Sequence, residues 1–293
     1  MKFYLIGASG NIGWPLYKFL KKKINITGTY NSVYKKELVK FNIYNFKKSK
    51  ILKLFKKNDV IIMMAAKTEI TWVYNNYKKS LELSNKIISL FKYLIKIKCK
   101  IIYVSTAEVF DGKKGFYDED SKPKPIHRYG ITKYMIENFL SSSGYNNYNI
   151  IRTAQNVSNN FFNNCIIKKT YESLRKKNAL IASDNFFSIT HSDDFNIIFF
   201  KIIKKKIKKK ILHIASNIYL SRIQLAKLII KFSKFKNLMS FKETKMRNLS
   251  TLEPKVAKST LVSKKTQKIL NFNNFIPPEI IVKRKISVID KFF

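Results

Sequence analysis

Three glycines spaced three residues apart directly follow the first apolar run of the chain. The run is Phe3-Tyr-Leu-Ile6, the glycines are Gly7, Gly10 and Gly13, and an apolar pattern of helical spacing follows from Leu16 to Leu20. Because the chain has only 8 glycines, three at one turn indicate a steric requirement. Such a turn lets the backbone approach a pyrophosphate, and the helix N-terminus offers free amides. These residues therefore predict a dinucleotide-binding turn.

Apolar runs and helical patterns alternate as far as residue 153. Runs typical of buried strands occupy 24–30, 59–66, 100–104 and 151–153, and helical patterns occupy 47–57, 80–95 and 129–140. This alternation predicts an α/β fold with a doubly wound parallel Rossmann sheet. The small Ala65 and Ala66, at the end of one strand, would let a cofactor lie close.

The end of the strand at 24–30 bears on the choice of cofactor. An NAD-binding site places an acid there for the ribose hydroxyls, but this chain has Asn31 and Ser32. Lys35 and Lys36 follow, and we expect no acid near enough to repel a 2′-phosphate. The sequence therefore favours NADPH, with NADH as the alternative.

A second chemical grouping lies between residues 105 and 133. Ser105 and Thr106 end the strand at 100–104, and Tyr129 and Lys133 lie four residues apart, on one face of the predicted helix. A tyrosine needs a pKa shift of about 3 units, or about 4 kcal/mol, to act near neutral pH. One ammonium at about 4 Å supplies about that much at an effective dielectric constant of about 20. We therefore predict proton transfer to or from a carbonyl or alcohol.

The formal net charge of +40 does not predict nucleic-acid binding. Of the 58 basic residues, only 6 are arginine, the side chain that reads bases and phosphates bidentately. The lysines are spread along the whole chain, as expected from compositional drift, and we interpret the run Lys204 to Lys210 as a solvated helix end and loop. We find no apolar run long enough to span a membrane. Two widely separated cysteines, Cys99 and Cys165, favour a cytoplasmic location.

Together, the motifs resemble those of the extended short-chain dehydrogenase/reductase family. The matching residues are Gly7, Gly10 and Gly13, Ala65-Ala66, Ser105-Thr106, and Tyr129 with Lys133. Within that family, the dTDP-4-dehydrorhamnose reductases are similar at Val109 to Gly112, Tyr117 to Asp120, Pro123 with Pro125, Tyr129-Gly130, Ile151 to Thr153, Asn160-Phe161, Thr190 to Asp194 and Leu212 to Ser216.

The resemblance implies a fold, a reaction and a cofactor site. Residues 1–155 would form the NAD(P)-binding Rossmann lobe, and 156–293 mainly a smaller substrate lobe, with segments returning to the first. NADPH would reduce a nucleotide-activated 4-keto-6-deoxy sugar, in the biosynthesis of deoxysugars such as dTDP-rhamnose and of cell-surface polysaccharide. Tyr129 would protonate the oxygen, Lys133 would lower the tyrosine pKa, and Ser105 or Thr106 would orient the carbonyl. The dinucleotide would contact Gly7, Ser9, Gly10, Asn11, Ile12, Gly13, Asn31, Ser32, Asn42, Ile43, Ala65, Ala66, Lys67, Tyr129 and Lys133.

Two positions depart from the pattern. The reductases read Ser-Thr-Asp-Tyr where this chain has Ser105-Thr106-Ala107-Glu108, and Asn42 replaces an expected acid beside Ile43. Because Ala107 cannot donate a proton, we expect no 4,6-dehydratase activity. We interpret Glu108 as a solvated loop carboxylate.

Other functions stay open at this point. An NAD-dependent sugar-nucleotide 4-epimerase would need tightly held NAD, and a non-catalytic NADP-binding regulatory subunit would have no need of Tyr129. We expect a sugar-nucleotide substrate and neither a nucleic-acid nor a membrane partner, and a homodimer is one arrangement that we keep open.

The C-terminal half carries fewer signals. Helical spacing occupies 161–174, 193–203 and 222–232, and Leu212 to Ala215 fits a strand. We expect His127 to line the pocket and His191 and His213 to be structural. The histidines and cysteines have no zinc-ligand spacing, so we expect no metal. Residues 234–262 suggest no function.

The end of the second strand generates the first testable prediction. Because no acid is expected there, the protein should bind NADPH more tightly than NADH, and Asn31→Asp should move the preference toward NADH. Dissociation constants for both dinucleotides, measured at physiological salt, check this. Equal or tighter binding of NADH by the unaltered protein contradicts it.

Overall fold

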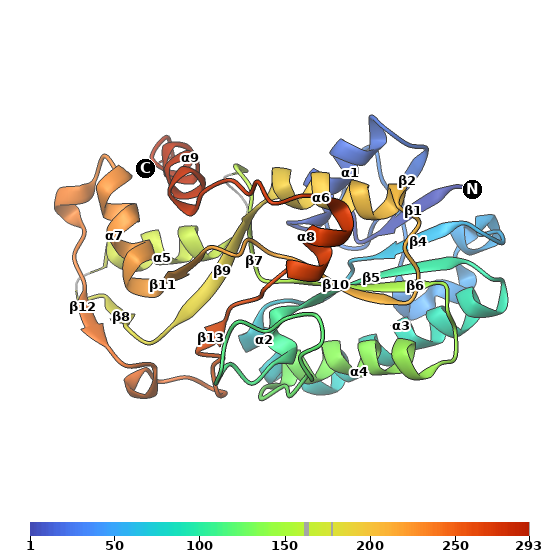
Figure 1. The fold of residues 1–293 in the computed structure, drawn as a ribbon, viewed down its shortest axis with the longest axis horizontal. Coiled ribbons are helices and arrows are strands. Elements are labelled where there is room, and N and C mark those ends of the chain that lie inside the picture. The colour runs from blue at the N-terminus through green and yellow to red at the C-terminus, as the bar shows by residue number, and fades with distance from the viewer. Residues whose placement is uncertain (161–163, 177, 293) are drawn as a thin grey trace.

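The computed structural model describes residues 1–160, 164–176 and 178–292. Its largest layer is a seven-stranded parallel sheet with the order β10-β6-β5-β4-β1-β2-β3 (Figure 1). The strands are β1 (Phe3–Ile6), β2 (Ile26–Tyr30), β3 (Val39–Lys40), β4 (Val60–Met63), β5 (Lys100–Thr106), β6 (Tyr148–Thr153) and β10 (Lys210–Ile214). The predicted doubly wound Rossmann sheet is confirmed.

Helices cover both faces of this sheet. One face packs against α1 (Gly13–Lys21), α6 (Ser192–Lys204) and α8 (Lys264–Leu270), which contribute Leu16, Phe195 and Leu270 to one apolar core. The other face packs against α3 (Tyr77–Lys96) and α4 (Arg128–Ser142). The strands β1, β4, β5 and β6 are buried on both faces, which is why they read as largely apolar runs. Three of these elements, α6, β10 and α8, come from beyond residue 155.

A second group of elements has its own core. A four-stranded sheet contains β7 (Gln155–Val157), β9 (Phe186–His191), β11 (Tyr219–Ser221) and β13 (Lys258–Ser259), and β8 (Leu180–Ala182) pairs with β12 (Lys242–Thr244). Around them pack α5 (Ile166–Leu174), α7 (Arg222–Phe232) and α9 (Pro278–Ile289). Of these elements, α5, α7, α9, β8, β11 and β12 lie at one end of the long molecule, away from α2 (Ile70–Asn75) and the large sheet (Figure 1). The predicted division at residue 155 stays a prediction.

The C-terminal part of the chain returns to the loop that follows β5. Val262 N donates to Tyr117 O at 2.8 Å, Tyr117 N donates to Thr260 O at 3.0 Å, and Lys258 N donates to Gly112 O at 3.1 Å. These backbone bonds connect the second group of elements to the end of the large sheet.

Two predicted helices differ in the structure. Residues 47–57 do not form one helix: two 3-10 helices, Ile43–Lys48 and Lys50–Leu54, meet at Ser49, whose backbone is extended. The buried Ile43 and Phe46 lie three residues apart, which suits a 3-10 turn and not a continuing α-helix. The helix predicted at 161–174 begins at Ile166, and its first three positions lie outside the described residues.

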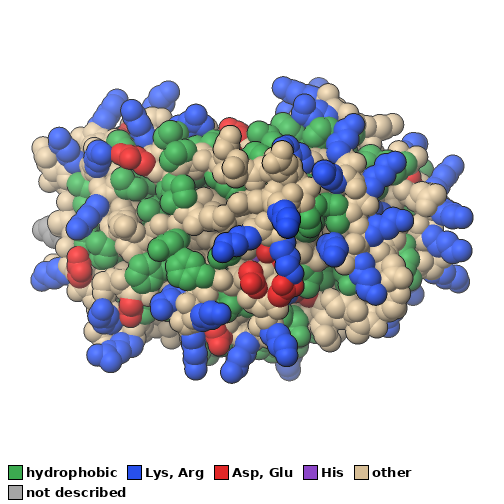
Figure 2. Space-filling model, viewed as in Figure 1, with side chains coloured by type: hydrophobic (Ala, Val, Ile, Leu, Met, Phe, Trp, Pro, Cys, Tyr) green, Lys and Arg blue, Asp and Glu red, His purple; other side chains and the backbone are tan. Residues whose placement is uncertain are grey.

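Charge is spread over the surface. Lys and Arg side chains are scattered over the visible face and gather in no single stripe (Figure 2). Lys204 to Lys210 link α6 to β10, and all but Ile207 are exposed, as predicted. Within the described ranges, we find no helix that combines the length and apolar content needed to cross a membrane.

Several turns hold side chains where glycine is usual. Seven described residues other than glycine have positive φ, among them Lys209 at φ 47°. A left-handed backbone costs an L-residue about 1–2 kcal/mol, because its Cβ crowds the following carbonyl. These positions therefore carry local strain.

The strain at Lys209 generates a prediction about stability. Lys209→Gly should raise the free energy of unfolding by about 1 kcal/mol, since glycine adopts this φ without crowding. The matched control is Lys208→Gly, which changes an exposed neighbour with no positive φ and should not stabilise the fold. Urea titrations of the three proteins measure the difference, and a less stable Lys209→Gly variant contradicts the prediction.

Candidate active site

The predicted functional residues meet at the carboxyl ends of β1, β4 and β5. These strands are neighbours in the centre of the sheet. The glycine turn follows β1, Ala65 and Ala66 follow β4, and Thr106 ends β5. Ligands of doubly wound sheets bind at this edge.

The glycine turn has the shape of a phosphate cradle. Gly7 has φ +88°, and a Cβ there would lie 2.6 Å from Ala65 N; a Cβ on Gly13 would lie 2.4 Å from Gly7 O. A Cβ on Gly10 would meet nothing closer than 3.4 Å, so protein packing does not require glycine there. Gly10 is exposed, and its missing side chain leaves the backbone open to a ligand. Helix α1 begins at Gly13 without a side-chain cap. Trp14 N already donates to Gly10 O at 2.9 Å, and Pro15 has no amide hydrogen, so Gly13 N is the helix amide that can bind an anion.

The remaining residues of this turn flank the cradle. Ser9 is half-buried, Asn11 is exposed, and Ile12 packs against the adjoining core. These positions are compatible with the dinucleotide contacts predicted for them.

The loop that follows β2 contains one acid. Asn31 and Ser32 are exposed, but Glu37 follows within the same loop. Glu37 accepts hydrogen bonds from Lys21 Nζ at 2.6 Å and Lys18 Nζ at 2.9 Å. These two lysines, Lys21 foremost, lower the pKa of Glu37 to about 2. The acid is therefore engaged by α1, and the prediction that no acid repels a 2′-phosphate at this strand end stays a prediction.

The two positions after β3 have local structural roles. Asn42 accepts a hydrogen bond from Tyr44 N at 3.0 Å and so caps the first 3-10 helix. Ile43 is buried.

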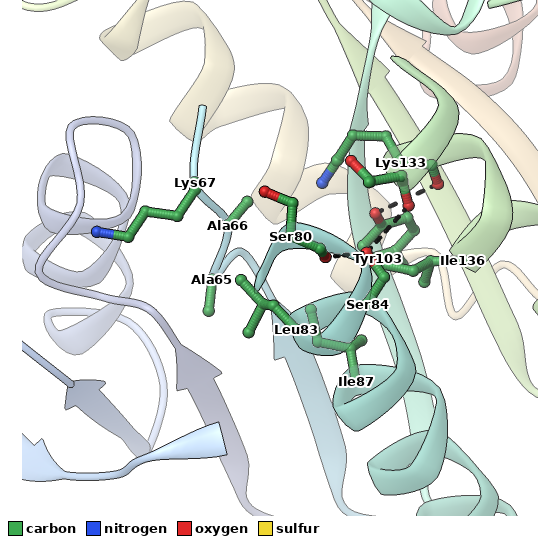
Figure 3. Close-up of a pocket in the computed structure, with 11 residues that line it drawn as sticks. Ala65, Ala66, Lys67, Ser80, Leu83, Ser84, Ile87, Tyr103, Lys133 and Ile136 are labelled. Atoms are coloured by element: carbon green, nitrogen blue, oxygen red, sulfur yellow. Dashed lines mark hydrogen bonds between the residues drawn. The ribbon is translucent and has the colours of Figure 1, made fainter. Parts of the chain in front are cut away.

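A pocket lies where the chain leaves β4, beside β5 and the helices α3 and α4 (Figure 3). Lys67 and Lys133 lie on opposite sides of it, with Ala65 and Ala66 between them. Helix α3 contributes Ser80, Leu83, Ser84 and Ile87, and Tyr103, Thr132 and Ile136 complete the lining. The buried Ser80 Oγ has no hydrogen-bond partner among the described residues. The position of Ser80 in the pocket was not predicted, because a serine within a helical pattern gives no signal of its own.

The structure places Thr106, rather than Ser105, beside Tyr129. Burial raises the pKa of Tyr129 well above the usual range, and the neighbouring Thr106 hydroxyl acts in the opposite direction. Thr106 Oγ1 accepts from Glu108 N at 3.3 Å, so its hydrogen remains available to another acceptor. Ser105 Oγ is buried and has no partner in the described part of the chain.

Lys133 has a different environment from the one predicted. Its Nζ donates to Val104 O at 2.8 Å and lies 4.4 Å from the ring centroid of Tyr103. Burial lowers the pKa of Lys133 to about 7, and the nearby Glu137 acts in the opposite direction. The predicted lowering of the Tyr129 pKa by Lys133 is not seen, because desolvation dominates both groups.

A buried ion pair below the site was also missed. Arg152 Nη2 donates to Glu137 Oε2 at 2.7 Å, and the two side chains are 1% and 2% exposed. Glu137 lies four residues beyond Lys133, on the same face of α4. The sequence signal for this pair was Glu137, an acid four residues after Lys133 on the predicted helix. Its partner Arg152 lies on β6 and could not be identified from the helix pattern.

Glu108 and His127 differ from their predictions. Glu108 is no freely solvated carboxylate, because its Oε2 lies 2.8 Å from His127 Nε2. His127 is buried at the N-cap of α4 and is absent from the pocket lining. His191 caps α6, and His213 contacts Val262 O at 3.0 Å, both in structural positions. In the described ranges, His, Cys, Asp and Glu side chains form no group of three or more that could hold a metal ion.

Comparisons with known proteins agree with this geometry. A family model described as "RmlD substrate binding domain" matches residues 1–275. No curated protein matches the chain.

Solved structures share the fold over nearly the whole chain. A hypothetical dTDP-4-dehydrorhamnose reductase from Sulfolobus tokodaii has a TM-score of 0.81 at 24% identity, with 96% of this chain and 99% of that chain covered. A dTDP-4-dehydrorhamnose reductase from Bacillus anthracis, in complex with NADP, has a TM-score of 0.77 at 20% identity, with 98% and 99% covered. A UDP-glucose 4-epimerase from Thermotoga maritima, with UDP-glucose, has a TM-score of 0.80 at 18% identity, with 100% and 99% covered.

The buried Lys133 generates a prediction about pH. Its folded pKa of about 7 lies below its ordinary 10.5. Between these values the unfolded chain binds more protons at this residue than the folded chain, so its contribution to stability rises with pH, by at most about 1.4 kcal/mol per unit. The free energy of unfolding of Lys133→Met should therefore rise less steeply from pH 7 to 10 than that of the unaltered protein. The control is the exposed Lys78→Met, and identical slopes for the Lys133 variant and the unaltered protein contradict the prediction.

Proposed function

Because the chain belongs to the RmlD substrate binding domain family, we propose that it is an NADPH-dependent oxidoreductase of the extended short-chain dehydrogenase/reductase type. Its substrate is a nucleotide-activated 4-keto-6-deoxy sugar, and its reaction is that of the dTDP-4-dehydrorhamnose reductases in deoxysugar biosynthesis. The observation that carries the proposal is the position of Thr106, at the end of β5, beside Tyr129 on the first turn of α4, with Lys133 one turn further on.

The residues present fit a dinucleotide. The open backbone at Gly10 and the uncapped start of α1 suit a pyrophosphate, and the partnerless Ser80 Oγ and Lys67 face the pocket between β4 and β5. The turn at Gly7 to Gly13, Asn31, Ser32, Asn42, Ile43, Ala65, Ala66 and Lys133 would hold it. When bound, NADPH supplies the hydride for a carbonyl carbon.

The side chains at the end of β5 can complete the reduction. Burial keeps Tyr129 protonated at neutral pH, so its hydroxyl is ready to give a proton to the carbonyl oxygen. Thr106 stabilises the developing charge on that oxygen by donating a hydrogen bond. A protonated phenol suits reduction better than the oxidation with which a 4-epimerase begins.

The remaining parts of the proposal rest on the sequence and the family. We assign substrate binding mainly to residues 156–293, together with the loop after β5 that they contact. A cytoplasmic location, a homodimer and the absence of nucleic-acid partners remain predictions.

The test is NADPH oxidation by the purified protein against a panel of dTDP-, UDP- and GDP-activated keto sugars. Turnover with a 4-keto-6-deoxy sugar supports the proposal. Tightly bound NAD, with conversion of UDP-glucose to UDP-galactose, replaces it with a 4-epimerase.

The pairing at the end of β5 gives a prediction that separates two neighbouring hydroxyls. Tyr129→Phe and Thr106→Val should each lower turnover, the former by about 10²-fold or more, and leave NADPH affinity nearly unchanged. Ser105→Ala is the matched control, because this hydroxyl has no partner at the phenol, and it should keep most of the activity. A larger loss from Ser105→Ala than from Thr106→Val reverses the assignment.

A further inference from the structure

Two polar side chains at the active site have no part in the proposed reaction. Glu108 follows Thr106 by two residues, and His127 precedes Tyr129 by two residues. His127 Nε2 and Glu108 Oε2 lie 2.8 Å apart, and the two side chains are 0% and 16% exposed. The contact therefore joins the end of β5 to the start of α4 inside the protein.

The second nitrogen of His127 caps the helix that carries Tyr129. Gly130 N donates to His127 Nδ1 at 3.0 Å. A ring nitrogen that accepts a hydrogen bond carries no hydrogen, so the hydrogen of neutral His127 is assigned to Nε2, where it is donated to Glu108. The Glu108 carboxylate thus accepts the hydrogen of the tautomer that caps α4.

The same turn also orients Thr106. Glu108 N donates to Thr106 Oγ1 at 3.3 Å, and the Thr106 hydroxyl lies beside the Tyr129 side chain. Helix α4 packs directly on this turn, since a Cβ on Gly130 would lie 2.1 Å from Glu108 O. These contacts therefore link Thr106 through Glu108 and His127 to the first turn of α4, which carries Tyr129.

We propose that Glu108 and His127 are positioning residues, which hold the Thr106 hydroxyl and the Tyr129 phenol at the distance and angle that reduction requires. Neither residue transfers a proton to substrate, because both ring nitrogens of the buried His127 are engaged and Glu108 acts through them. This inference rests on the proposed function, since its main effect is on turnover.

Variants of Glu108 separate positioning from proton transfer. Glu108→Gln keeps an oxygen that can accept from His127 Nε2, whereas Glu108→Ala removes it. We expect Glu108→Ala to lower kcat by about 10- to 100-fold, as small misplacements at a reacting centre do. Glu108→Gln should stay within about threefold of the unaltered protein, and NADPH affinity should change in neither variant.

A second variant tests the path through the imidazole. Asparagine is a good N-cap residue, so His127→Asn can keep the bond from Gly130 N, although it offers no Nε2 to Glu108. Adding Glu108→Ala to His127→Asn should then cause no further loss of kcat, because the path is already broken.

The imidazole of His127 gives a readout that needs no substrate. The chain has 3 histidines, so ¹⁵N spectra of the imidazoles can be assigned with single variants. His127 should be the Nε2–H tautomer in the unaltered protein, in Glu108→Gln and in Glu108→Ala, because Gly130 N still donates to Nδ1. Its Nε2 resonance should shift in Glu108→Ala, where the acceptor of the Nε2 hydrogen is gone, and much less in Glu108→Gln.

Three results overturn the inference: a Glu108→Gln variant as slow as Glu108→Ala, kcat losses that multiply in the double variant, or a His127 Nε2 resonance that Glu108→Ala leaves unchanged. Failure of the proposed function looks different. It would appear as an unaltered protein that oxidises no NADPH with any keto sugar, while the imidazole spectra still give their answer.

Discussion

The buried ion pair between Arg152 and Glu137 fixes the helix on which the active site depends. Both side chains are almost fully buried, with three hydrogen bonds between them. Loss of either partner would leave a charge uncompensated inside the protein, at a cost of about 3–5 kcal/mol. The pair joins β6 to α4, and the guanidinium also lies 5.0 Å from the ring of Phe110, in the loop after β5. The ion pair therefore holds α4, which carries Tyr129 and Lys133, against β6 and the loop that follows Thr106.

The sequence predicted what depends on local pattern. The glycine turn, the buried strands and the spacing of Tyr129 and Lys133 could be read from neighbouring residues, and the structure contains each of them. The choice between Ser105 and Thr106 could not be made in this way, because it depends on which hydroxyl the start of α4 approaches. The electrostatics of Lys133 reversed for a similar reason: the prediction took a charged ammonium near the phenol, whereas burial favours the neutral amine.

Isolated acids were the least predictable residues. The sequence predicts a solvated loop carboxylate for Glu108 and no role for Glu37, yet each has a partner from another element. Two lysines of α1 engage Glu37, and His127 at the start of α4 engages Glu108. The local sequence shows the charge of such a residue, and only the fold shows which side chain it pairs with.

Most glycines of this chain occupy positions where a side chain does not fit. At six of the eight, an added Cβ would come within 3.0 Å of another atom; the exceptions are Gly10 and Gly144. By contrast, seven described turns with positive φ hold asparagine, lysine or phenylalanine. Side chains are thus found at turns where the backbone penalty is about 1 kcal/mol, whereas glycine occupies six positions where atoms would collide. Gly10 is neither crowded nor left-handed, so a demand from outside the polypeptide explains its retention better than folding does.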